Sequence, residues 1–162
     1  MEKKSQIYLE TSAWNFYFAD DSPERMKETI QFFTALPNSG YAPFISRIVT
    51  DEINDAEPEK REKLIDLVTE HNPAMIGSTD EIEELAQEYF DHDIFSDTMR
   101  NDGLHVAHAT AAGMDAVVSW NLKHIANRRR QQKVQEINRQ CGFLKPLILI
   151  TPTEAGQNAG RL

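Results

Sequence analysis

The 162-residue sequence has little of several features that mark other protein classes. Its single cysteine, Cys141, excludes an internal disulfide, which agrees with a reducing, cytoplasmic location. No stretch approaches the roughly 20 apolar residues of a membrane span, so we expect no membrane association. The first residues, MEKKSQIYLE, lack the apolar core of a secretory signal and run directly into a strand-like segment.

Basic residues are also scarce overall, and their distribution is uneven. The formal net charge is −9, from 26 acidic and 17 basic side chains. Residues 1–121 carry 24 acidic and 9 basic side chains, whereas residues 122–162 carry 2 acidic and 8 basic ones. The total disfavours nucleic-acid binding, but the local basic patch in residues 123–145 can attract phosphate groups. A solvated helix face accounts for the same residues, so both interpretations stay open.

Short apolar runs alternate with amphipathic segments along the whole chain. We expect five strands, at residues 6–9, 41–46, 73–77, 116–120 and 147–150. Helix-start signals occur at Ser22-Pro23, Ser46, Glu57-Pro58 and Thr79, and a long polar helix is expected over 122–140. This alternation predicts an α/β fold, a three-layer α/β/α sandwich with a central parallel sheet. We expect one domain over residues 1–151 and a frayed C-terminal tail over 152–162.

Polar side chains gather at the predicted carboxyl ends of the strands, where parallel α/β sheets bind ligands. These side chains are Glu10, Thr11 and Ser12 after the first strand, Glu52 after the second, Asp102 before the fourth, and Asn121 and His124 after it. Three carboxylates that share a pocket repel one another unless a cation is present. Oxygen ligands suit Mg²⁺ or Mn²⁺, and such an ion can activate water and neutralise a phosphoryl oxygen. The sequence therefore indicates phosphodiester hydrolysis.

Three motifs in this order resemble those of PIN-domain proteins, in particular the bacterial toxins of the VapC type. They are Ile7 to Ser12; Ile45-Ser46 with Asp51 to Ile53; and Asp102 to Ala107 with Val117 to Asn121. The continuation Trp120-Asn121-Leu122-Lys123-His124-Ile125 resembles a bacterial subgroup with a WNxxHI ending. The resemblance implies a PIN-like fold and a metal-dependent endoribonuclease, the toxin of a type II toxin–antitoxin pair.

The resemblance also implies roles for individual residues. Glu10, Glu52, Asp102 and Asn121 would be catalytic, and Glu10, Asp102 and Asn121 would hold the Mg²⁺ or Mn²⁺. Substrate binding is assigned to Ser12 and His124, and the local basic patch adds Arg128, Arg129 and Arg130 to it. The implied partners are an RNA substrate, a cognate antitoxin protein and a second copy of the chain.

The chain departs from the family pattern, and other interpretations follow from that. Glu10 and His124 stand where the family usually has Asp, and Asn121 stands where it usually has an acid. These changes favour the alternative of a weakened PIN-like module that binds RNA or protein without cutting. A phosphoryl-transfer enzyme would need a nucleophilic Asp in place of Glu10, and a dinucleotide-binding fold would need a Gly-rich turn there.

Two histidines on the helix expected to begin near Asp102 also require an interpretation. His105 and His108 lie three residues apart, but no Cys or third His stands at zinc-like spacing. We expect His108 to pack in the core and His105 to be partly exposed.

Overall fold

The computed structural model describes residues 3–162 and contains one five-stranded parallel sheet. Its strands are β1 (Ser5–Leu9), β2 (Tyr41–Ser46), β3 (Ala74–Ile76), β4 (Ala116–Val118) and β5 (Ile148–Ile150). They lie in the order β3-β2-β1-β4-β5, and all four pairings are parallel. The chain therefore builds outward from β1 on one side, then crosses to the other side for β4 and β5. This reversal places the topological switch point between β1 and β4.

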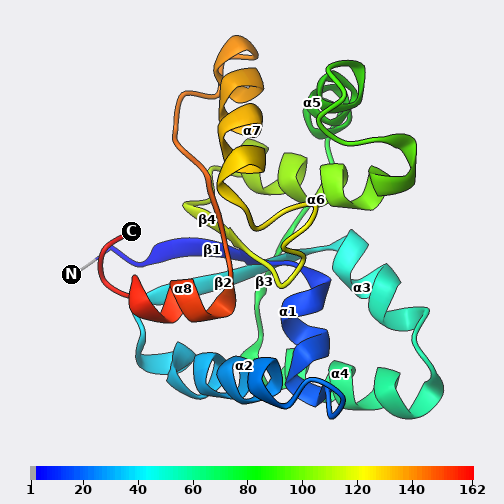
Figure 1. The fold of residues 1–162 in the computed structure, drawn as a ribbon, viewed down its shortest axis with the longest axis vertical. Helices are drawn as coiled ribbons and strands as arrows, with labels where there is room; N and C mark the ends of the chain where they lie inside the picture. Colours follow the sequence, from blue (N-terminus) through cyan, green and yellow to red (C-terminus); the bar gives the residue numbers. More distant parts are fainter. Residues whose placement is uncertain (1–2) are drawn as a thin grey trace.

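Helices cover both faces of the sheet and complete the predicted α/β/α sandwich (Figure 1). Figure 1 shows α2, α4 and α8 below the sheet and α5, α6 and α7 above it. The α-helices are α1 (Thr11–Asn15), α2 (Pro23–Ala35), α3 (Arg47–Asn54), α4 (Pro58–His71), α5 (Asp80–Asp91), α6 (Arg100–Ala111), α7 (Arg128–Gln140) and α8 (Pro152–Gln157). Short 3₁₀ turns occupy Phe16–Phe18, Leu36–Asn38 and Asp97–Met99.

The strands are apolar because helices cover both faces of the sheet. Consecutive residues of a strand point to opposite faces, so a strand covered on both faces must be apolar throughout. Ile7, Tyr8 and Leu9 of β1 accordingly have no exposed surface, and neither do Val117 and Val118 of β4. The apolar runs that predicted the first and fourth strands therefore form the centre of the sheet.

Two of the four predicted helix-start residues, Ser46 and Thr79, cap their helices with a side-chain hydrogen bond, whereas Ser22 and Glu57 begin theirs without one. Ser46 accepts a hydrogen bond from the backbone N–H of Ile48, and Thr79 accepts one from Ile82. Each bond satisfies a backbone donor that has no partner within its own helix. The chain consequently turns from β2 into α3 at once, which brings Glu52 close to the strand ends.

Three local predictions were wrong. The polar residues Glu10-Thr11-Ser12 predict a turn after the first strand, but Thr11 and Ser12 form the first turn of α1, because the Glu10 side chain accepts from the Ser12 N–H as its N-cap. The helix expected over 122–140 begins only at Arg128, since Asn127 is its N-cap and the residues before it form turns. The tail is not frayed: Thr151 and Glu154 form a capping box, and α8 packs against α2.

Within residues 3–162, every helix is too short or too polar to cross a membrane.

Candidate metal centre

Four of the predicted site residues meet at the carboxyl edge of the sheet, beside the switch point. Glu10 follows β1 directly, and Asn121 lies three residues beyond β4. Glu52 comes from α3 and Asp102 from the first turn of α6. The topology therefore brings together residues that are far apart in the chain, as the sequence predicted.

Glu10 is a buried carboxylate held by three donors. Only 5% of the residue is exposed. Its Oε2 accepts from the Ser12 backbone N–H at 3.0 Å, and its Oε1 accepts from the hydroxyls of Ser12, at 2.6 Å, and Ser119, at 2.5 Å. Those hydroxyls in turn accept backbone N–H groups, of Trp120 by Ser12 and of Asn121 by Ser119. The loop after β4 thus fixes the direction of both hydroxyls and, through them, of the carboxylate.

The Ser12 hydroxyl is therefore engaged with Glu10, as a group that orients the carboxylate. Its predicted contact with substrate stays a prediction. Ser119 orients the carboxylate in the same way, although the sequence did not indicate a role for it.

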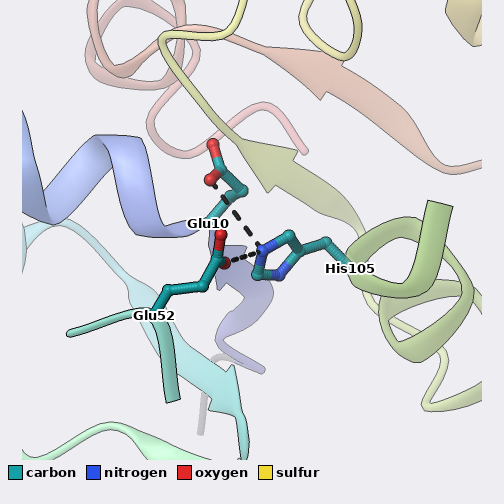
Figure 2. Close-up of side chains that lie close together, drawn as sticks. All are labelled: Glu10, Glu52 and His105. Atoms are coloured by element: carbon teal, nitrogen blue, oxygen red, sulfur yellow. Dashed lines mark hydrogen bonds and ion pairs between the residues drawn. The ribbon is translucent and has the colours of Figure 1, made fainter. Parts of the chain in front are cut away.

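His105 joins the two glutamates in one cluster (Figure 2). Its Nε2 lies 2.6 Å from Glu52 Oε1 and 4.0 Å from Glu10 Oε2. Its Nδ1 lies 2.6 Å from the Tyr8 hydroxyl, which is itself 2.7 Å from the Ser46 hydroxyl. The imidazole is thus held from both sides, and its plane is fixed against the carboxylates. The expectation that His105 is partly exposed was wrong, because the residue is completely buried.

Glu52 is stabilised as a carboxylate. Burial alone would raise its pKa, but hydrogen bonding and charge from His105, with hydrogen bonds from Thr11 and Asn101, lower it below the ordinary value. The Thr11 hydroxyl donates to Glu52 Oε1 at 2.8 Å. Glu52 is therefore ionised at neutral pH and supplies a negative charge to the cluster.

The surroundings of Asp102 raise its pKa, whereas those of Glu52 lower the pKa of that carboxyl. Burial and the neighbouring charge of Glu10 raise its pKa, and His105 and His124 only partly offset them. Its Oδ2 lies 3.1 Å from His124 Nδ1, and its Oδ1 accepts from the Asn121 amide at 3.4 Å. The charge of Glu10 thus disfavours the ionised form of Asp102, and a cation between the two carboxylates would offset that repulsion.

Asn121 lies next to Asp102, but its carbonyl oxygen is already engaged. That oxygen accepts the backbone N–H of His124 at 3.0 Å and so closes the turn after β4. Asn121 thus caps this turn with its carbonyl oxygen and contacts Asp102 with its amide nitrogen. Asn121 also contributes no charge.

The predicted basic residues lie at the start of α7. Arg128 and Arg129 are exposed, whereas Arg130 is half-buried with its guanidinium 4.9 Å from the centre of the Phe95 ring. Partial burial lowers the pKa of Arg130, and the charge of Asp102 acts in the opposite direction. Arg130 is thus the arginine that lies electrostatically closest to the acidic residues.

The donor set fits a divalent ion. One ligand atom each from Glu10, Glu52 and His105 can be chosen so that all three lie within 4.8 Å of one another. His105 Nε2 and Glu52 Oε1 share a hydrogen bond at 2.6 Å. An ion on Nε2 would replace that bond, while the imidazole proton would lie on Nδ1 beside the Tyr8 hydroxyl. Carboxylate oxygens suit Mg²⁺ and Mn²⁺ alike, and the imidazole nitrogen favours Mn²⁺, the transition metal of the two.

This ligand group differs from the one that the sequence suggested. Among residues 3–162, Asp102 is not part of the three-residue group, and His105 is. A signal for His105 was present, because it follows Asp102 by three residues on one helix and must share its face. His108 faces elsewhere, with Nδ1 donating to the Leu104 carbonyl at 2.7 Å, so the two histidines do not form a pair.

No family model, curated protein or solved structure matches this chain. The case for a function therefore rests on the motifs of the sequence and on the geometry of this pocket.

Proposed function

We propose that the protein is a divalent-metal-dependent endoribonuclease. The observation that carries the proposal is the meeting of two glutamates, Asp102 and a buried imidazole at the strand-order switch of a parallel sheet. Glu10, Glu52 and His105 would hold the ion. A bound Mg²⁺ or Mn²⁺ would supply the activation of water and the neutralisation of charge on the phosphoryl oxygens.

The remaining residues of the pocket have distinct tasks in this proposal. Ser12 and Ser119 orient the Glu10 carboxylate through the hydrogen bonds described above. Asp102 accepts from Nδ1–H of His124, so in the imidazolium form of the ring Nε2–H is the group that can give a proton to the departing oxygen. The side chain of His124 is 31% exposed, so a substrate can reach it.

RNA as the substrate, the toxin role and the partners follow from the motif resemblance. The basic segment at the start of α7 supports a polyanionic substrate, because it lies beside the acidic pocket rather than on a remote surface. The antitoxin partner and the homodimer stay predictions.

A second candidate function is an RNA-binding module that does not cut. Asn121 favours it, since this residue adds no charge and its carbonyl oxygen is occupied by a backbone N–H. Such a site has fewer ligands for an ion than one with a fourth carboxylate.

Cleavage of a panel of structured RNAs in Mg²⁺ or Mn²⁺ separates the two functions. The wild type and Asp66→Asn, which makes the same chemical change at an exposed position of α4, should cut equally. Asp102→Asn should cut about 100-fold more slowly or worse, because the variant loses the charge that positions His124. Equal cutting by Asp102→Asn would refute the role of Asp102. Binding without cutting by the wild type would establish the second function.

A further inference from the structure

A separate cleft lies between α7 and the segment that follows α5. Its volume is about 450 Å³, many times the roughly 30 Å³ that one water molecule occupies in the liquid. Four basic side chains line it, and Asp93 is the only acidic one: the basic residues are Lys123, Arg129, Arg130 and Lys133. A protein with a net charge of −9 thus has a cavity of the opposite sign.

The positive charge of this cleft is not neutralised inside the protein. Among the described residues, none of the four basic side chains forms an ion pair within 4.0 Å. Lys123, Arg129 and Lys133 are exposed, so their charges are available to a ligand. The Arg130 guanidinium is placed against the Phe95 ring, which fixes its direction.

The cleft is lined by residues that are close in the chain to residues of the acidic pocket. Lys123 is the chain neighbour of His124, whose ring contacts Asp102. Arg130 responds to the charge of Asp102, and Met99 of the cleft lies three residues before it on the same segment. Lys123 and Met99 of the cleft are thus chain neighbours of His124 and Asp102, the arrangement that one extended strand needs to contact both sites.

We propose that this cleft binds a backbone phosphate of a single RNA strand, away from the phosphate that is cut. The proposal rests on the proposed function, because the cleft would hold a part of the RNA strand that lies beside the phosphate that is cut. The two arginine guanidinium groups offer forked N–H donors that match phosphate oxygens, and the two lysines add charge. Arg128 is excluded from the cleft although it is in the same helical turn, so the three neighbouring arginines have different tasks.

The test measures RNA binding without cutting. A fluorescently labelled single-stranded oligoribonucleotide is titrated in EDTA at several salt concentrations, and its anisotropy gives Kd. Arg129→Gln and Lys133→Gln should each raise Kd about fivefold and reduce the slope of log Kd against log salt by about 0.7. Arg139→Gln removes the same charge from the exposed far end of α7 and should leave both values unchanged.

Two comparisons make the test decisive for the cleft. Arg128→Gln should weaken binding less than Arg129→Gln does, because only Arg129 lines the cleft. Equal effects of Arg128→Gln, Arg129→Gln and Arg139→Gln would overturn the proposal, since binding would then follow total charge. RNA binding that the cleft variants leave unchanged would also overturn it. If those variants alone instead lose the binding of an acidic peptide, the cleft is a protein-binding site.

The same variants distinguish this inference from the proposed function. If the wild type binds RNA through the cleft but never cuts it, the phosphate site is supported and the nuclease function is refuted. If Arg129→Gln and Lys133→Gln change neither the metal-dependent cutting nor the Kd for RNA, the nuclease function is supported and the phosphate site is refuted.

Discussion

Addition of Mn²⁺ should raise the thermal stability of the protein. Burial and the charge of Glu10 raise the pKa of Asp102, so the Glu10 and Asp102 carboxylates repel each other when both are ionised. A divalent ion on Glu10, Glu52 and His105 would remove that repulsion in the folded state. The unfolded chain does not bring these three residues together, so the ion binds the folded state selectively.

The magnitude follows from this selective binding. A ligand that binds only the folded state adds about 2.7 kcal/mol to the free energy of unfolding at a concentration 100 times its Kd. In a domain of about this length, 1 kcal/mol corresponds to a change of about 2–4 °C in Tm. Saturating Mn²⁺ should therefore raise Tm by about 5–10 °C. The shift in Mg²⁺ should be smaller, because imidazole nitrogen is a poorer ligand for Mg²⁺.

Differential scanning calorimetry over a Mn²⁺ titration measures the shift. Glu10→Gln keeps the size of the side chain but removes its charge, and should lose most of the shift. Glu136→Gln makes the same change at an exposed position of α7 and should retain the full shift. An equal shift in both variants would mean that the ion binds elsewhere, and a wild type whose Tm does not respond to Mn²⁺ would refute the metal centre.

Other predictions concern stability away from the ligands. Burial lowers the pKa of His108 below its ordinary value of about 6.5, so below that pH the unfolded chain binds more protons and the free energy of unfolding falls. His108→Gln should flatten this fall in urea titrations made at several pH values; an unchanged slope would contradict it. Leu9→Ala should cost about 2–5 kcal/mol in urea unfolding, because Leu9 is fully buried in β1, and a loss under 1 kcal/mol would contradict this packing. Thr151→Ala should cost about 1 kcal/mol through loss of the α8 capping box, whereas a frayed tail would show no change in Tm.

The sheet and the carboxylates could be predicted from the sequence because each has a local signal. An apolar run such as Ile7 to Leu9 is typical of a strand that is buried on both faces, and polar residues that follow such runs meet at one edge. This reasoning placed Glu10, Glu52, Asp102 and Asn121 in one region, as the structure has them.

His105 was missed because its environment depends on tertiary contacts. Residues 103–110 of α6 are all buried, so the spacing that puts His105 on the face of Asp102 does not show how deeply the ring lies. The position of His105 is set by Tyr8 and Glu52, which lie far away in the sequence. Helix α8 had a local signal in Thr151 and Glu154, but too few apolar residues follow it to reveal that it packs on α2.

The rate of RNA cleavage as a function of Mn²⁺ concentration tests the central claim most directly. If the pocket of Glu10, Glu52 and His105 holds the catalytic ion, cleavage should require the metal. The rate should reach half its maximum at the Mn²⁺ concentration that gives half the thermal shift, and Glu10→Gln should abolish both. Cleavage in EDTA, or cleavage that Glu10→Gln and Asp102→Asn leave at the wild-type rate, would contradict the account.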